Sequence, residues 1–223
     1  GDRLSVDLYN MFDSLMETIV FTFKQSGDYE SYRNECMSQL SVDPNVTEQE
    51  FSSLGSEQVL NRLEKQVFEV YELKKQHLRN VFMPIVENVY QNQGHRYKRI
   101  LVPYHDGSMH PLPVSAELKK AVESAGESLS TDIEQAITLS LIDDKWKEHL
   151  RAMDELKDSV QSASFEQKDP LVIYKMEAYK LFENLIHTIN REVVSYLMRG
   201  QLMVETGEQI REAKEQKTDL SNI

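Results

Sequence analysis

The sequence predicts a mainly α-helical chain with a long antiparallel helical hairpin and one minor β-hairpin. Along most of the chain, apolar residues recur at alternating three- and four-residue steps, the spacing of a helix face. Glycine and proline number only eight and six in 223 residues, which favours long helices over strand-and-turn architecture. A two-residue alternation appears only in residues 94–114. With 40% apolar residues, we expect an extended helical body rather than a large compact core.

The N-terminal segment predicts an amphipathic helix. Gly27 suits the left-handed residue that ends a helix, and Asp28 can cap the next one. We interpret the apolar stripe of the first helix as core rather than as a cofactor-binding face. The stripe comprises Leu4, Leu8, Met11, Phe12, Leu15, Met16, Ile19, Val20 and Phe23.

Two more helices are expected before residue 94. Thr47 and Glu50 have the spacing of a capping box, which predicts a short helix closed by Gly55. Ser56 opens a long helix that contains Pro84, so we expect a kink or a break near that proline. The bend either serves as a hinge or follows the neighbouring surface.

Residues 94–114 predict a β-hairpin. Ile100 and Val102 alternate with polar residues, and the pair Asp106 and Gly107 is a turn dipeptide. A short helix is expected from Ser115 to about Gly126.

A long helical hairpin is expected from Thr131 to Gly200. Thr131 and Glu134 resemble a second capping box at its start. The two predicted seams, through which the helices would pack on each other, are Leu139, Ile142, Trp146, His149, Met153, Leu156 and Val160, and Leu171, Tyr174, Ala178, Leu181, Leu185, Ile189, Val193 and Tyr196.

The turn and the end of this hairpin are marked by local signals. Asp169 supplies an N-cap oxygen and Pro170 suits the first helical position, while Gly200 marks the end of the second helix. The charged residues 205–223 predict a flexible tail. Trp146 is expected to be buried between the hairpin and the first helix.

Charge and composition exclude several functions. A net charge of −12 argues against nucleic acid as a partner. Neither a signal peptide nor a run of roughly 20 apolar residues is present in the sequence. Cys36 is the only cysteine, so a reducing cytosol is the default. Because the chain begins with glycine, we expect a piece of a larger protein.

Few residues suggest chemistry of their own. The sequence has no glycine-rich phosphate loop, which predicts that this chain carries no nucleotide site and is not itself an enzyme. His105, Asp106 and His110 could hold a metal ion or support an enzyme, but turn residues on a solvated loop explain them as well.

Two groups of polar residues in the long hairpin also have a structural explanation that involves no chemistry. His149 is either a catalytic base or, more simply, a packed histidine bonded to a carboxylate. Asp143 and Asp144 point about 100° apart on a helix, so they predict a solvated face rather than a carboxylate pair.

Several short runs in the hairpin resemble the SecA family, the ATPase motors of bacterial preprotein translocation. These runs are WKEHL at residues 146–150, MD at 153–154, QKDP at 167–170, YK at 174–175 and LF at 181–182. The resemblance implies a structural motif made of Trp146, His149, Leu150, Met153, Asp169, Pro170 and Tyr174.

The resemblance also implies a division of the chain. Residues 1–24 would end the long scaffold helix, 25–130 would form the helical wing with an inserted β-hairpin at 94–114, and 131–204 would form the two-helix finger. The family's nucleotide-binding folds, preprotein cross-linking domain and zinc-binding tail are not part of this sequence.

The expected site is the tip of the finger. The resemblance implies that Phe165, Gln167 and Lys168 contact the preprotein or the channel mouth, although Phe165 could instead pack back on the hairpin. Where the family reads Arg-Gly-Tyr, this chain has Ala-Ser-Phe at 163–165, so the aromatic ring is kept without the hydroxyl and the arginine. Ile173 replaces a usual acidic residue.

The resemblance implies a mechanical role and a set of partners. The parent would use ATP and magnesium, with zinc in its tail, whereas no cofactor is expected in this chain. The partners would be unfolded preprotein, the SecY channel and the rest of the motor, in the cytoplasm and peripherally at the inner membrane. The alternative function is a cytosolic helical adaptor without a motor.

Overall fold

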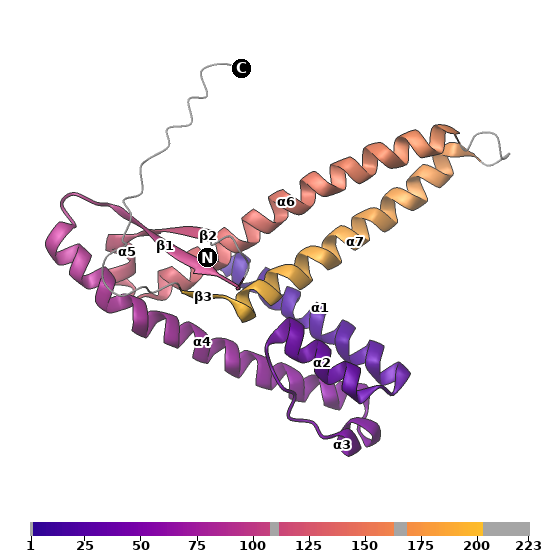
Figure 1. The fold of residues 1–223 in the computed structure, drawn as a ribbon, viewed down its shortest axis with the longest axis horizontal. Coiled ribbons are helices and arrows are strands. Elements are labelled where there is room, and N and C mark those ends of the chain that lie inside the picture. The colour runs from indigo at the N-terminus through magenta and orange to yellow at the C-terminus, as the bar shows by residue number, and fades with distance from the viewer. Residues whose placement is uncertain (1, 108–111, 163–168, 203–223) are drawn as a thin grey trace. The chain divides into compact units, whose positions relative to one another are not determined.

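The computed structural model describes residues 2–107, 112–162 and 169–202 and confirms the mainly helical fold class (Figure 1). One small sheet accompanies the helices. In chain order the elements are α1 (Asp2–Ser26), α2 (Tyr29–Leu40), α3 (Glu48–Ser53), α4 (Ser56–Gln93), β1 (Arg99–His105), β2 (Leu112–Glu117), α5 (Leu118–Glu123), α6 (Glu127–Ser162), α7 (Pro170–Arg199) and β3 (Gln201–Leu202).

The chain divides into two compact units. Of the described residues, the first unit contains 2–71, 137–162 and 169–199, and the second contains 72–107, 112–136 and 200–202. The long helices α4 and α6 therefore each have one end in the first unit and the other end in the second. The family-based boundaries after residues 24, 130 and 204 stay predictions.

The core of the first unit is built around α1, which packs against α2 and α7. The ring of Phe12 lies 5.1 Å from that of Tyr71 and 5.6 Å from that of Phe68, both on α4. The apolar stripe of α1 is core, as predicted. Its buried members are Leu8, Phe12, Leu15, Met16, Ile19 and Val20.

The predicted helix ends of this unit are confirmed. Gly27 has φ +72°, the left-handed conformation expected after α1. Asp28 Oδ1 accepts the backbone N–H of Ser31 at 3.0 Å and caps α2. Thr47 and Glu50 exchange side-chain and backbone hydrogen bonds at the start of α3, which is the capping box that the spacing indicated.

Pro84 does not break α4. The helix runs from Ser56 to Gln93 without interruption, so the alternative of a break is wrong, and the alternative of a kink stays a prediction. A helical proline removes one backbone hydrogen bond, but Phe82 and Val86 on either side of it are buried and hold the helix against its neighbours.

The starts of α5 and α6 differ from the predicted positions. Ser115 lies in β2 opposite Leu101, and α5 begins three residues later at Leu118. α6 begins at Glu127, so the expected capping box at Thr131 is wrong. Gly126, at φ +83°, provides the turn, and the hydroxyl of Ser124 accepts the N–H of Ser128 at 3.1 Å in the first turn of α6.

The second unit contains a three-stranded antiparallel sheet with strand order β2-β1-β3. The predicted hairpin is confirmed, with Val102 opposite Val114 and Pro103 opposite Pro113. Strand β3 was not predicted. Among the described residues, it pairs with Tyr104 and His105 of β1. One face of the hairpin is buried through Ile100, Val102, Tyr104, Val114 and Ala116.

The described residues lack two features that would indicate particular functions, a membrane-spanning helix and a metal-binding cluster. Among these residues, no helix has the length and apolar character needed to cross a membrane. The same residues contain no cluster of histidine, cysteine and carboxylate side chains suited to a metal ion.

Candidate functional site: the α6–α7 helical hairpin

Helix α7 and residues 137–162 of α6 form an antiparallel pair within the first unit (Figure 1). The N-terminus of α7 is built as predicted. Pro170 is its first residue, and Asp169 Oδ1 accepts the backbone N–H of Leu171 at 2.9 Å. Gly200 follows the last residue of the helix, again as predicted.

A lysine on α6 ties the two helices together. Lys145 Nζ lies 3.1 Å from a carboxylate oxygen of Glu192 on α7 and 3.3 Å from one of Glu148 on its own helix. Burial alone would lower the pKa of Lys145, but the hydrogen bonds to Glu192 and Glu148 outweigh burial and raise it. The lysine therefore stays charged and bridges α6 to α7.

His149 lies between two aromatic rings. Its ring centroid is 5.4 Å from that of Trp146 and 6.3 Å from that of Phe182 on α7. The expected bond to a carboxylate does not occur among the described residues, so that part of the prediction is wrong. The contacts are those of a packed side chain in an aromatic group that spans the two helices.

Trp146 is exposed, which corrects the expectation that it is buried against α1. Its relative exposure is 46%, and Leu139 and Ile142 of the predicted seam are exposed as well. Apolar residues at three- and four-residue steps lie on two neighbouring faces of α6. The sequence alone does not show which of these faces packs against another helix. The less exposed side of α6 in the hairpin runs through Lys145, His149, Ala152, Leu156 and Val160.

Both helices of the hairpin therefore present large apolar side chains to solvent. We call these residues the apolar stripe of the hairpin. They have relative exposures between 37% and 67% and comprise Leu139, Ile142, Trp146 and Leu150 on α6, and Leu171, Val172, Met176, Tyr179, Phe182 and Ile186 on α7. Single exposed apolar residues are ordinary, but ten of them on two paired helices make the hairpin a candidate interaction surface.

Charged residues line the same part of α6. Asp143 and Asp144 are both exposed, and Lys147 Nζ forms ion pairs with each, at 3.8 Å from Asp144. This arrangement confirms a solvated helix face rather than a pair of facing carboxylates.

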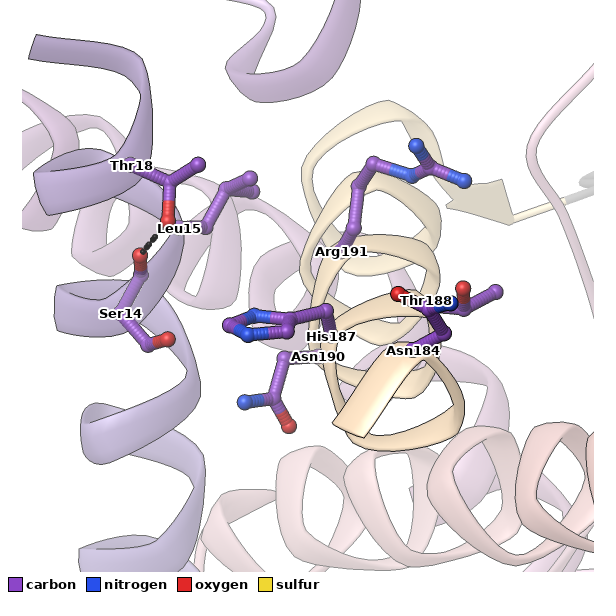
Figure 2. Close-up of a pocket in the computed structure, with 8 residues that line it drawn as sticks. All are labelled: Ser14, Leu15, Thr18, Asn184, His187, Thr188, Asn190 and Arg191. Carbon is purple, nitrogen blue, oxygen red and sulfur yellow. Dashed lines mark hydrogen bonds between the residues drawn. The ribbon is translucent and has the colours of Figure 1, made fainter. Parts of the chain in front are cut away.

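A shallow pocket of about 380 Å³ lies between α1 and α7 (Figure 2). Figure 2 shows His187 and Asn190 of α7 directed toward α1, where the Thr18 hydroxyl donates to the Ser14 carbonyl at 2.8 Å. The lining residues are Ser14, Leu15, Thr18, Asn184, His187, Thr188, Asn190 and Arg191.

The pocket is suited to polar contacts with another molecule. Its lining offers hydrogen-bond donors and acceptors but no carboxylate. Within the described part of the chain, Ser14 and His187 share no hydrogen bond, so they do not form a nucleophile and base pair. Sequence reasoning missed the pocket, although the polar residues at three- and four-residue steps on α7 were a usable signal.

The remaining predicted residues are placed only in part. Leu150 is exposed, and Met153 and Tyr174 are half-buried. Phe165, Gln167 and Lys168 lie outside the described residues, as does His110. The Nδ1 atom of His105 accepts the backbone N–H of Gly107 at 3.2 Å, which supports the turn-residue interpretation of that loop.

Comparison with known proteins gives a consistent result. Residues 1–201 match the family model of the SecA Wing and Scaffold domain. The chain is 42% identical to the protein translocase subunit SecA of Flavobacterium psychrophilum, an alignment that covers 100% of this chain and 21% of the relative. It is 38% identical to that of Christiangramia forsetii, with 98% of this chain and 19% of the relative covered.

A third relative matches this chain over a similar length. The protein translocase subunit SecA of Phocaeicola vulgatus is 36% identical over 100% of this chain and 21% of its own length. The chain thus spans about a fifth of the length of the curated relatives it matches. No solved structure was found to match it.

Proposed function

The chain belongs to the SecA family of protein translocase subunits, and from this premise we propose that it is the mechanical scaffold and finger of such a translocase. In this proposal the parent hydrolyses ATP with magnesium in parts outside this chain. The α6–α7 hairpin passes the resulting movement to an unfolded preprotein at the SecY channel, from the cytoplasmic side of the inner membrane.

The observation that carries the proposal is the apolar stripe of the hairpin. Apolar surface left in water is unfavourable by roughly 25 cal/mol per Å², so ten large exposed side chains on two helices favour a partner that covers them. Apolar and aromatic contacts need no fixed partner sequence, which suits a substrate as variable as an unfolded polypeptide.

The helices themselves suit a mechanical element. α6 and α7 have 36 and 30 residues, and at about 1.5 Å per residue each extends well beyond an average helix. The Lys145–Glu192 pair and the ring contacts of His149 hold them side by side. No observation favours a helical adaptor without motor activity.

The test compares matched exposed leucine substitutions in the full-length parent. Leu150→Ser on the hairpin, at 49% exposure, should lower the amount of preprotein transported per ATP hydrolysed by several-fold. Leu73→Ser on α4, at 64% exposure, serves as the control and should leave this ratio unchanged.

Both substitutions should change the free energy of unfolding by less than about 0.5 kcal/mol, because neither site is buried. Equal transport ratios for the wild type and the Leu150→Ser protein, in a transport-competent preparation, would remove the support for a contact role of the stripe.

A further inference from the structure

The C-terminal part of α7 is buried within the first unit, where the helix packs against α1 and α2. Its buried apolar residues are Leu185, Ile189, Val193, Val194, Leu197 and Met198. The exposed apolar residues of α7, by contrast, lie between Leu171 and Ile186. We call residues 185–199 the base of α7. How the base is held decides where the apolar stripe of the hairpin is presented.

One polar pair lies in the contact between the base of α7 and α2. The Ser195 hydroxyl donates a hydrogen bond to Oε1 of Gln39 at 2.6 Å. Ser195 is 2% exposed, and Gln39 is half-buried. Because water hardly reaches Ser195, moving Gln39 away would leave a shielded hydroxyl without this partner, which is unfavourable. The two residues are 156 positions apart in the sequence, so the bond depends on how α2 and α7 pack.

The pair fits one register of α7 against α2. A slide of one helical turn, about 5.4 Å, would bring a residue three or four positions from Ser195 opposite Gln39. The neighbours three positions away are Glu192 and Met198, and neither has a hydrogen to donate at neutral pH. The neighbours four positions away are exposed arginines, and burying a guanidinium group would be unfavourable. A single buried polar pair can therefore select the register of packed helices.

The same turn of α7 is held from a second side. Glu192 lies three positions before Ser195, and its carboxylate is 3.1 Å from Nζ of Lys145 on α6. Ser195 thus holds this turn against α2, while Glu192 holds it against α6. Apolar contacts have no preferred direction and tolerate a slide, whereas a hydrogen bond requires a particular distance and angle.

We propose that Gln39 and Ser195 are positioning residues that fix the register of α7 against α2. The apolar stripe then keeps its place along α1 and α2 when another molecule bears on the hairpin. This inference rests on the proposed function, because the register matters for transport only if the hairpin passes movement to another molecule. It adds to that function the helix and the two residues that hold the hairpin in place.

Removing the pair in two steps separates positioning from stability, measured by backbone amide hydrogen exchange in the full-length parent. Gln39→Leu leaves Ser195 buried without its acceptor and should accelerate exchange at Val193 and Leu197 by about fivefold or more. Adding Ser195→Ala removes the donor as well. Exchange in this double variant should return to within about twofold of the wild type, because an apolar pair of similar shape packs without an unsatisfied group.

A distance measurement reports the register itself. Spin labels replace Met37 on α2 and His187 on α7, which are both exposed, and they are attached through ketone-bearing amino acids so that cysteines need not be changed. The wild type should give one narrow distance distribution. The double variant should add a second population displaced by several ångström. The control is Gln76→Leu at an exposed position of α4, which should leave the distribution unchanged.

The functional arm measures preprotein transported per ATP hydrolysed. This ratio should fall several-fold in Gln39→Leu and remain low in the double variant, although its exchange has recovered, whereas Gln76→Leu should transport normally. A merely structural pair would let transport recover together with exchange, which would overturn the positioning role and leave the proposed function intact.

Two other outcomes would also overturn the inference. One is a single narrow distance distribution in the double variant. The other is exchange as fast in the double variant as in Gln39→Leu, which would indicate a general loss of packing. Failure of the proposed function appears separately, in the Leu150→Ser comparison.

Discussion

At the level of single residues, burial decides which side chains hold the fold and which remain available for contact. Cys36 has no exposed surface, and its burial raises the pKa of the thiol to about 12. Such a thiol is packed and unreactive at neutral pH. Trp146, the largest side chain in the chain and its only tryptophan, has the opposite environment and is nearly half exposed.

This difference predicts a small effect for Trp146→Ala. We expect it to lower the free energy of unfolding by less than about 1 kcal/mol, because its burial is partial. Phe12→Ala, at a site with no exposed surface, should cost about 3–5 kcal/mol. Urea unfolding followed by circular dichroism measures both. Comparable losses in the two variants would show that Trp146 is part of the core after all.

Glu64 predicts a pH-dependent effect. Burial, together with the charges of Asp13 and Glu17, raises its pKa above the ordinary value of 4.5. A carboxyl with a raised pKa in the folded state destabilises the fold at neutral pH, and this cost vanishes as pH falls below the ordinary pKa.

Glu64→Gln should therefore stabilise the protein at pH 7, by about 0.5 kcal/mol for a partly solvated group. The gain should shrink as pH falls through the raised pKa of the folded state and be absent below about pH 4. Denaturant unfolding at several pH values measures it, with the exposed Glu69→Gln as control. A gain that persists at pH 3 would contradict the electrostatic cause.

At the level of elements, the features that depend on neighbouring residues in the sequence could be predicted. The features that depend on tertiary contacts could not. The caps at Asp28, Thr47 and Asp169 depend on residues within one helical turn, so the sequence contains the whole signal. The pairing of β3 with β1 depends on residues about 100 positions apart and has no local signature. The capping-box spacing at Thr131 predicted the wrong start for α6, because the same residues also fit a helix interior.

The candidate site shows the same division. The two helices and the N-terminus of α7 could be predicted from spacing and caps, whereas the face of α6 that meets α7 could not. Two neighbouring faces carry apolar residues, and only the packed structure shows that Leu156 and Val160 turn inward while Trp146 and Leu150 stay exposed. The pocket lined by Asn184 and His187 depends on how α1 approaches α7.

The capping box of α3 gives an element-level prediction. Thr47→Ala should cost about 1 kcal/mol, because it removes the acceptor of the Glu50 N–H in a helix of only six residues. Thr18→Ala is the control, since the Thr18 hydroxyl donates to the Ser14 carbonyl within α1. Its unfolding free energy should change by less than about 0.5 kcal/mol. Equal losses in thermal unfolding would argue against the cap.

At the level of the whole molecule, the chain spans about a fifth of the length of the curated relatives it matches, and most of the exposed large apolar side chains among the described residues lie on the hairpin. These exposed side chains are not part of the chain's buried core. The parent's motor parts, the preprotein and the channel are the partners that our proposal assigns to the hairpin, with contact to the preprotein or the channel at its tip.

The tip residue Phe165 provides a prediction for the parent. If this ring contacts other molecules, Phe165→Ala should change the free energy of unfolding by less than about 0.5 kcal/mol. It should nevertheless slow preprotein transport while ATP hydrolysis without preprotein continues at nearly the normal rate. A loss of several kcal/mol with normal transport would mean that Phe165 packs on the hairpin and that Gln167 or Lys168 makes the contact.

Site-specific photo-cross-linking tests the central claim most directly. A photoreactive amino acid replaces Phe165 in the full-length parent, and a preprotein is stalled in the channel during ATP turnover. A second protein carries the same group at Glu57, an exposed residue of α4. The account predicts ATP-dependent cross-links from position 165 to the preprotein or the channel, and none from position 57. Cross-links of equal yield from both positions, or none from position 165 while transport proceeds, would contradict it.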